Sequence, residues 1–275
     1  DFCGSPHVLE QESNRNLIRP ESMLPFAVDQ GRARIMFSEW IGSLWFRPSD
    51  LKKKASVGEI NGVYIPYWTF DAWVSSSWTA QAGHDYQEQE QYWGKDANGN
   101  NVQMTRTVTK TRWQPAWGSR QDHHDDVLVC AGRGLPEALV QQLHGFELNQ
   151  LRPYDPGFLS GWRAEEYAVD LNEAWGKGLK KIEATQQQRC HNDVRADRVQ
   201  NLNVMNQFGQ EKFKHILLPI WIASYRYNDK VFRFLINGQN GQVQGEAPYS
   251  WVKIFFFSVF VLMVLSLICL LTQGN

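Results

Sequence analysis

The sequence predicts an α+β protein built from two related halves, each an antiparallel sheet with a helix, followed by a single C-terminal transmembrane helix. Three observations support this fold class. Long stretches rich in aromatic and β-branched residues alternate as strands do, two segments carry apolar residues at helical spacing, and residues 254–271 form an uncharged apolar run. With 275 residues, 43% of them hydrophobic, the chain is long enough to bury a core.

The first half is expected to begin with a short strand and a helix. Residues 23–28 are typical of a strand, and Asp29 is a suitable N-cap for a helix that continues to about residue 46. A β-meander follows. Its strands are expected at 62–80, 86–93 and 102–113, with a hairpin turn at 96–100, where Asn-Gly accepts the positive φ of such turns.

The second half is expected to begin with helices and to end with strands. A short helix is predicted at 137–143, and a long one at 164–190 has apolar residues at helical spacing. A strand at 213–227 then turns at Asn228-Asp229 into a returning strand at 230–238.

A short similarity between two strands indicates that the halves are related. The segment VYIPYW (63–68) and the segment ILLPIW (216–221) both place a proline two residues before a tryptophan. Proline within a strand belongs at an edge or a bulge because it cannot donate to the ladder. The expected segments are 1–22 for the remnant of a zinc ribbon and a linker, 23–134 for the first half, 135–248 for the helical segment with the second half, and 249–275 for the membrane anchor.

The C-terminal segment predicts a membrane anchor. Ile254 to Leu271 contains 18 residues without charge, which at about 1.5 Å per residue spans roughly 27 Å. Trp251 and Lys253 precede it, as interfacial residues do. Because Lys253 lies on the side of the large domain, the positive-inside rule places that domain in the cytoplasm. A buried core helix is the alternative interpretation.

The first residues predict a zinc site that is mostly outside this chain. Cys3-Gly4-Ser5 resembles the second half of a Cys-x-x-Cys-Gly turn, whose first cysteine would precede residue 1. The chain begins with Asp, so we expect it to be part of a longer polypeptide. His7 is an alternative second ligand at a C-x3-H spacing, and the zinc in the full-length protein would be structural.

A second candidate metal site lies in DHHDD (122–126). Only alternate residues of a strand share a face, so His124 and Asp126 are the pair that would bind together. A surface or structural role is the other interpretation of this cluster, and Cys190-His191 is a further candidate pair. A metal hydrolase would need a complete ligand set, which the spacing does not offer. We therefore expect no catalytic residues and no enzyme activity.

Charge and aromatic content narrow the class of partner. Lys and Arg total 28 and Asp and Glu total 29, so the net charge of −1 gives no basic footprint for nucleic acid. Twelve tryptophans are expected to lie mostly in the core, with some forming a face for protein docking. Stacking on nucleic-acid bases is the alternative role for these side chains.

Five longer motifs are distinctive, namely PESMLPF (20–26), GVYIPYWTFDA (62–72), DDVLV (125–129), FKHILLPIWIASYRY (213–227) and FLINGQNGQVQGEAPYSWVKI (234–254). These motifs resemble a family of bacterial zinc-ribbon membrane proteins, often labelled as transcription-factor-IIB-type zinc-ribbon or primosomal-protein-N'-like proteins. The resemblance implies further Cys-x-x-Cys pairs upstream, and a partner similar to phage-shock protein A or to the SPFH (flotillin-like) proteins. No G-x-x-x-x-G-K-[ST] loop is present, so no helicase motor is expected. The segment 225–246 is also similar to PepSY-like or cystatin-like modules, which bind or scaffold.

These expectations lead to one functional prediction. The chain is a membrane-anchored adaptor or scaffold that holds a partner protein assembly, phage-shock-like or SPFH-like, at the bacterial cytoplasmic membrane. The alternative is a membrane-tethered nucleic-acid-binding zinc-ribbon protein. Single-pass anchors often assemble, so the oligomeric state stays open.

Overall fold

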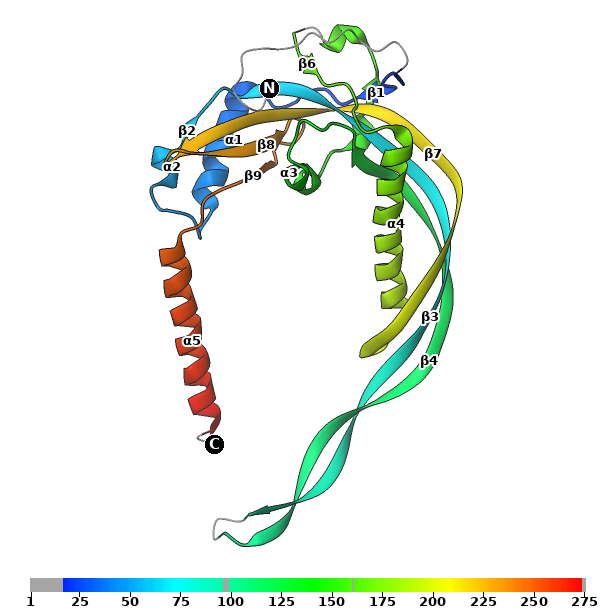
Figure 1. The fold of residues 1–275 in the computed structure, drawn as a ribbon, viewed down its shortest axis with the longest axis vertical. Helices are drawn as coiled ribbons and strands as arrows, with labels where there is room; N and C mark the ends of the chain where they lie inside the picture. The colour runs from blue at the N-terminus through cyan, green and yellow to red at the C-terminus, as the bar shows by residue number, and fades with distance from the viewer. Residues whose placement is uncertain (1–16, 96–98, 160, 274–275) are drawn as a thin grey trace. The chain divides into compact units, whose positions relative to one another are not determined.

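A computed structural model of the chain describes residues 17–95, 99–159 and 161–273. Cys3, His7 and most of the expected hairpin turn at 96–100 lie outside these described residues. The structure confirms a mixed α+β fold with a large sheet and an apolar C-terminal helix (Figure 1).

The described residues form nine strands of one sheet, five α-helices and two 3₁₀ turns. The helices are α1 (Gln30–Ser43), α2 (Leu51–Lys54), α3 (Glu137–Gln142), α4 (Leu171–Asp193) and α5 (Trp251–Gln273), with 3₁₀ turns at Leu148–Gln150 and Pro156–Leu159. The strands are β1 (Ser22–Met23), β2 (Ser56–Val57), β3 (Asn61–Lys95), β4 (Asn101–Cys130), β5 (Arg152–Pro153), β6 (Arg163–Ala164), β7 (Arg198–Tyr227), β8 (Lys230–Asn237) and β9 (Val243–Gly245). Their order is β4-β3-β7-β1-β5, with β2 and β8 also on β7, β6 on β3 and β9 on β8.

The chain divides into two compact units that interleave along the sequence. Unit 1 contains residues 1–68, 130–171 and 214–275, and unit 2 contains residues 69–129 and 172–213. The segments expected from the sequence follow one another along the chain, whereas these two units do not. The two units are described separately.

The core of unit 1 lies where α1 packs on β7 and β8. Phe37 of α1 stacks on Phe234 of β8 with ring centroids 4.1 Å apart, and Tyr225 of β7 lies against both rings. The predicted N-cap is confirmed, because the Asp29 carboxylate accepts a hydrogen bond of 2.8 Å from the main-chain N–H of Arg32.

One chain of hydrogen bonds connects β7, β8 and the segment before α1. The carbonyl of Pro219 accepts a bond from the N–H of Gly238, at 2.8 Å. The carbonyl of Gly238 in turn accepts bonds from the N–H groups of Ala27 and Val28, both at 2.9 Å. The Val28 carbonyl accepts a bond of 2.9 Å from the indole N–H of Trp221. Pro219, one of the two prolines of the related segments, thus accepts through its carbonyl, although it cannot donate.

The same chain of bonds occurs a second time in unit 1. The carbonyl of Pro66 accepts a bond of 2.9 Å from the N–H of Ala131. The Ala131 carbonyl accepts bonds from Ala168 and Val169, at 2.8 and 3.0 Å. The Val169 carbonyl then accepts a bond of 2.9 Å from the indole N–H of Trp68.

The position of these bonds explains where α4 begins. The sequence analysis expected that helix from residue 164, but it starts at Leu171. Residues 163–164 form β6, and the N–H groups of residues 168 and 169 bind Ala131 rather than a helical turn. In each of the two chains of bonds, the valine is followed by an aspartate and then by the first residue of a helix. These first residues are Gln30 of α1 and Leu171 of α4.

Unit 2 is a curved sheet that carries α4 on its inner side (Figure 1). Ile182 of α4 packs with Ala72 and Val74 of β3, and Cys190 packs with Trp78. The even-numbered residues of β3 from 72 to 82 are buried, as alternation on a half-covered sheet requires.

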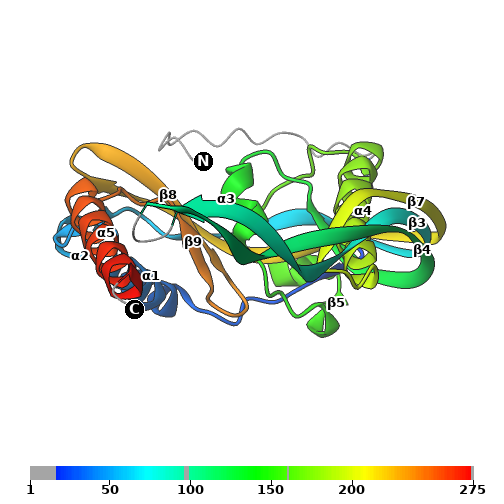
Figure 2. The same ribbon diagram turned by 90° about the horizontal axis from the view of Figure 1, so that it is seen from below.

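The helix α5 meets the requirements for a membrane span. Among the described residues it is the one helix long and apolar enough to cross a bilayer, with a mean hydropathy of 2.6 over Trp251–Cys269. None of that stretch is buried inside the described part of the protein, whereas the core helix of a soluble protein would be mostly buried. In unit 1, α5 starts beside the loop between α1 and α2 (Figures 1 and 2).

Candidate functional site

The outer side of unit 2 is the face of the sheet that α4 leaves uncovered. Contacts between β3 and β4 show how the two strands are paired. Odd-numbered residues of β3 lie opposite odd-numbered residues of β4, and even-numbered residues lie opposite even-numbered ones. Asp85 contacts Thr111, Tyr92 contacts Met104, and Trp73 lies 4.9 Å from His123 between ring centroids. The odd-numbered residues of 73–93 and of 101–123 therefore lie on one side of the two-stranded ribbon, which we call the outer face and which turns with the twist of the hairpin toward its tip (Figure 1).

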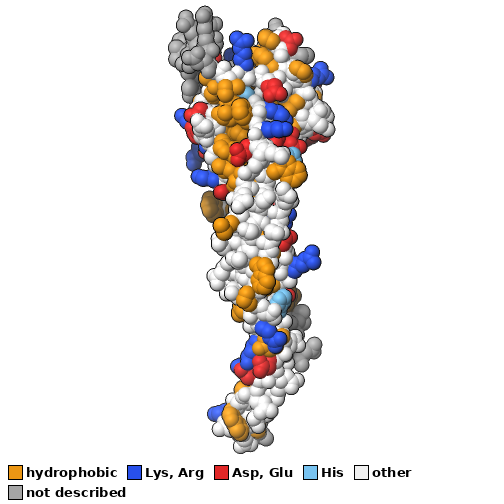
Figure 3. All heavy atoms as spheres, turned by 90° about the vertical axis from the view of Figure 1, so that its right-hand side faces the viewer, with side chains coloured by type: hydrophobic (Ala, Val, Ile, Leu, Met, Phe, Trp, Pro, Cys, Tyr) orange, Lys and Arg blue, Asp and Glu red, His pale blue; other side chains and the backbone are white. Residues whose placement is uncertain are grey.

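The outer face is almost uncharged and carries exposed aromatic rings. Apart from Asp85 and His123, its residues are Ser, Thr, Gln, Asn, Gly, Pro and Trp. Trp93 and Trp117 have 73% and 76% of their surface exposed. Figure 3 looks onto the outer side of the long strands: uncharged atoms and separate hydrophobic patches dominate the middle of the view, and charged side chains gather toward its lower end. Exposed tryptophans on a neutral surface are typical of protein docking sites.

Apart from Asp85, which pairs with Arg198 of β7 at 3.1 Å, the ion pairs of the hairpin lie on the opposite side. Glu90 binds Arg106 at 2.8 Å, and Glu88 binds Lys110 at 2.9 Å. These pairs are exposed and contribute little to stability. These charged residues lie on the even-numbered side, where Arg106 also lies over the ring of Tyr92. The outer face therefore stays close to neutral.

A polar network under α4 connects that helix to the sheet of unit 2. Arg120 donates two hydrogen bonds to the Asp122 carboxylate, at 2.6 and 2.9 Å, and Arg189 of α4 donates another at 2.8 Å. Arg120 also binds Asp193, at 2.7 Å. The bonds from Arg120, with its charge and that of Arg189, lower the pKa of the Asp122 carboxyl to about 2, although burial opposes this.

A second contact of α4 is neutral and buried. Gln186 donates a bond of 2.9 Å to the Ser76 hydroxyl on β3, and that hydroxyl donates one of 2.7 Å to Asn206 on β7. Gln186 is fully buried and Ser76 nearly so. A buried polar chain of this kind fixes the register of helix and strands, so the outer face has a defined shape.

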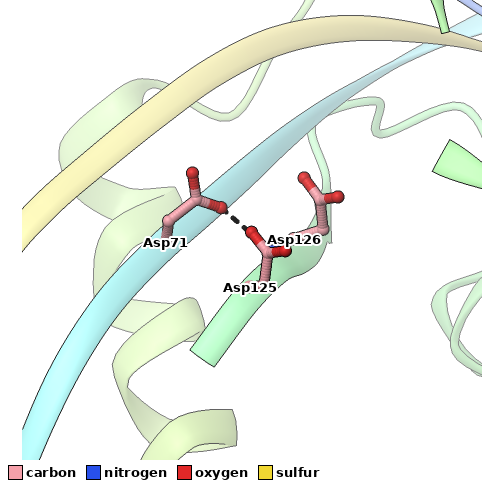
Figure 4. A group of neighbouring side chains, drawn as sticks. All are labelled: Asp71, Asp125 and Asp126. Carbon is pink, nitrogen blue, oxygen red and sulfur yellow. Dashed lines mark hydrogen bonds between the residues drawn. The ribbon is translucent and has the colours of Figure 1, made fainter. Parts of the chain in front are cut away.

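The predicted pair His124 and Asp126 lies at the end of β4. His124 is buried, and desolvation is the main reason that its pKa is lowered. Asp126 has a φ of 54°, which interrupts the alternation of the strand, and its N–H donates a bond of 2.9 Å to the Asp71 carboxylate. Asp126 gathers with Asp71 and Asp125, with ligand atoms within 4.8 Å of one another, and His124 lies outside that group (Figure 4).

This acidic group has no feature that distinguishes a metal site from an ordinary surface cluster. Asp71 comes from β3, and the two other carboxylates come from β4 (Figure 4). Exposed acidic groups are common without an ion. The zinc predicted at Cys3 falls outside the described residues and stays a prediction.

At one end of unit 1, α5 is joined to the loop after α1. The N–H of Ser250 donates to the Phe46 carbonyl at 2.8 Å, and the Lys253 amine donates to the Trp45 carbonyl at 3.2 Å. Arg47 lies over the Tyr249 ring, 3.8 Å from its centroid. Of the predicted anchor residues, Trp251 is exposed and Lys253 and Ile254 are half-buried in the first turn. Leu271 lies near the end of the helix.

The contact between this loop and α5 was not predicted from the sequence. The signal was present in Trp45-Phe46-Arg47-Pro48, two aromatic residues and a cation in a short loop. Such residues are typical of a membrane interface. Their distance of about 200 residues from the span concealed the connection.

Comparisons with known proteins give one informative match. No family model and no solved structure matches the chain. An uncharacterized protein of Bacillus subtilis (strain 168), YdjG, is 25% identical over 249 residues. The match covers 86% of this chain and 66% of YdjG, so the chain spans just under two thirds of that relative's length. The match names no activity, substrate or partner.

Proposed function

We propose that this chain is a membrane-anchored adaptor that holds a partner protein at the bilayer through the outer face of unit 2. The observation that carries the proposal is the contrast between the two sides of that sheet. One side is occupied by α4 and by ion pairs, while the other presents Trp93 and Trp117, largely exposed, on a neutral surface. The span α5 supports the anchoring.

The composition of the outer face suits a folded protein partner. Tryptophan supplies large contact area at a low entropic cost, and the surrounding Ser, Thr and Gln side chains provide hydrogen bonds that need no counter-charge. Tethering would raise the effective concentration of anything that docks there. In line with the family resemblance, the partner we propose is a phage-shock-protein-A-like or flotillin-like assembly.

The finer fold assignment is part of this proposal. The two series of hydrogen bonds support a duplicated sheet-plus-helix module because their partners follow the same order. Each series ends where a buried tryptophan donates to the carbonyl of a valine, and a helix begins shortly after that valine. In each copy the helix would pack on an antiparallel sheet, as in PepSY-like or cystatin-like modules. Such modules bind or scaffold, which agrees with an adaptor rather than an enzyme.

Orientation and zinc complete the proposal. Lys253 precedes the span on the side of unit 1, which favours a cytoplasmic location for the folded units. A structural zinc ribbon that includes Cys3 would precede them.

Co-purification tests the docking face. The full-length tagged protein would be extracted in mild detergent, and bound proteins would be identified and quantified by mass spectrometry. We expect the double change Trp93→Ser and Trp117→Ser to reduce recovery of the partner at least about tenfold, because interface tryptophans carry much of the binding energy. The matched control is Tyr86→Ser with Tyr92→Ser, which lie on the even-numbered side and should leave recovery unchanged.

Two results would contradict the proposal. Equal loss in both double variants would show that the outer face has no special role. Salt-dependent recovery of nucleic acid in place of protein would favour the nucleic-acid-binding alternative.

A further inference from the structure

A groove runs along the first turns of α5, beside the loop between α1 and α2. Its volume is about 390 Å³, which falls in the range of small-molecule sites. The lining residues are Trp45, Phe46, Val252, Lys253, Phe256, Phe257 and Phe260. All of them belong to unit 1, and six of the seven are apolar or aromatic.

The wall of this groove is held in place by the fold. Phe46 and Trp45 both meet the ring of Phe257 edge-on, with centroids 5.3 and 5.7 Å apart. The carbonyls of the same two loop residues accept bonds from Ser250 and Lys253. The loop is therefore fixed to α5 at several points, and the groove exists before any ligand enters.

The groove extends from the membrane interface into the apolar part of the span. Lys253 lies in the first turn, and Phe260 lies seven residues further on, roughly 10 Å along the helix axis at 1.5 Å per residue. A cation is therefore located at one end, and aromatic rings continue toward the bilayer interior. The Lys253 ammonium uses one of its three donors on the Trp45 carbonyl, which leaves donors for an anion.

We propose that this groove binds one phospholipid of the surrounding bilayer and prefers an anionic headgroup. The acyl chain lies against Phe46, Phe256 and Phe260, and the phosphate accepts a hydrogen bond from Lys253. Two observations select a lipid over a second copy of the chain. The groove is continuous with the lipid-exposed surface of α5. The cation at one end of the groove, Lys253, favours an anionic occupant, whereas a second α5 running in the same direction would bring another Lys253 to that end.

The role of the loop follows from this site. A single span leaves a soluble unit free to rotate about its anchor, whereas a lipid held between loop and helix adds a second attachment to the bilayer surface. The inference does not depend on the partner that docks on unit 2.

Photo-crosslinking tests the site in the full chain. The protein would be reconstituted in phosphatidylcholine vesicles that contain phosphatidylglycerol with a diazirine in its acyl chain, and the adducts would be mapped by mass spectrometry. We expect adducts to concentrate on residues 45–46 and on the groove-facing residues of α5. Non-reactive phosphatidylglycerol should compete about fivefold better than phosphatidylcholine, because one lysine near an anionic surface contributes about that factor.

Variants separate the two parts of the proposal. The double change Trp45→Ala and Phe46→Ala should reduce the adducts at the groove to the level seen on the far side of α5. Leu262→Ala, at an exposed apolar residue on that far side, should leave them unchanged. Lys253→Gln should retain the adducts but abolish the preference for phosphatidylglycerol, with folding of each variant verified by circular dichroism.

Three outcomes would overturn the proposal. Adducts distributed evenly around α5 in the unchanged protein would indicate ordinary annular lipid. Unchanged adducts in the double loop variant would remove the loop from the site. A cross-linked dimer joined through the groove residues would show that a second copy occupies it.

Discussion

Replacing Asp122 by asparagine should weaken the attachment of α4 to the sheet of unit 2. The carboxylate accepts two bonds from Arg120 and one from Arg189, and 13% of its side chain is exposed. Its pKa falls from the ordinary value of 3.8 to about 2, mainly through the bonds from Arg120. At about 1.4 kcal/mol for each pH unit, that difference corresponds to roughly 2 kcal/mol of free energy of unfolding near pH 7.

The pH dependence of Asp122→Asn gives a sharper check than the loss itself. Because folding lowers this pKa, the folded state binds the proton less readily than the unfolded state does. The stabilisation is therefore complete above about pH 4 and disappears as the pH falls through about 2. The difference in stability between wild type and variant should shrink over that window.

Urea unfolding in detergent micelles, followed by circular dichroism from pH 7 to pH 2, measures this difference. The matched control on α4 is Glu173→Gln. Glu173 binds Lys177 at 3.0 Å, but both side chains are more than 40% exposed, so the loss should stay below about 0.5 kcal/mol. A difference for Asp122→Asn that is as large at pH 2 as at pH 7, or is absent at pH 7, would refute the role assigned to the carboxylate.

Two further pairs of substitutions test the fold by urea unfolding of the full chain. Trp68→Phe and Trp221→Phe should each lower the free energy of unfolding by about 2 kcal/mol, because each leaves a buried carbonyl without its indole donor. A loss of stability in only one of these two variants would argue against equivalent roles for the two tryptophans. Gly176→Ala should raise stability by about 1 kcal/mol, because that helical site faces open space. Gly178→Ala should lower it, because a new Cβ would lie 3.0 Å from Phe70, and the reverse order would contradict this packing.

The sequence predicted those structural elements whose backbone conformation depends on residues close by in the chain. Asp29 caps α1 as expected, and Asn228-Asp229 forms a two-residue hairpin turn with φ values of 46° and 61°. The apolar run that becomes α5 needed no information from the rest of the chain. In each case a few neighbouring residues determine the backbone conformation.

Features that depend on distant residues were not predicted. The first part of β7 was not identified as a strand, since positive φ values at Asn201 and Gln210 interrupt its alternation. The approach of Asp71 to Asp125 requires the pairing of β3 with β4, which adjacent sequence does not encode.

The exposed tryptophans of the outer face were not identified from the sequence. That some tryptophans form a docking face stays a prediction, and the structure shows only which of them are exposed. That choice depends on which side of the sheet α4 covers, and Ile182 of the helix packs on Ala72 and Val74 rather than on the odd-numbered residues. Tertiary packing therefore decides which alternate positions become surface.

Recruitment of the partner in cells tests the central claim most directly. The partner recovered by co-purification would be labelled with a fluorescent protein and imaged in cells that express either the full-length chain or a form that lacks residues 251–275. The adaptor account predicts that the partner lies at the membrane with the full-length chain and moves to the cell interior with the truncated form, while still co-purifying with it. A partner that stays at the membrane without the span would contradict the account.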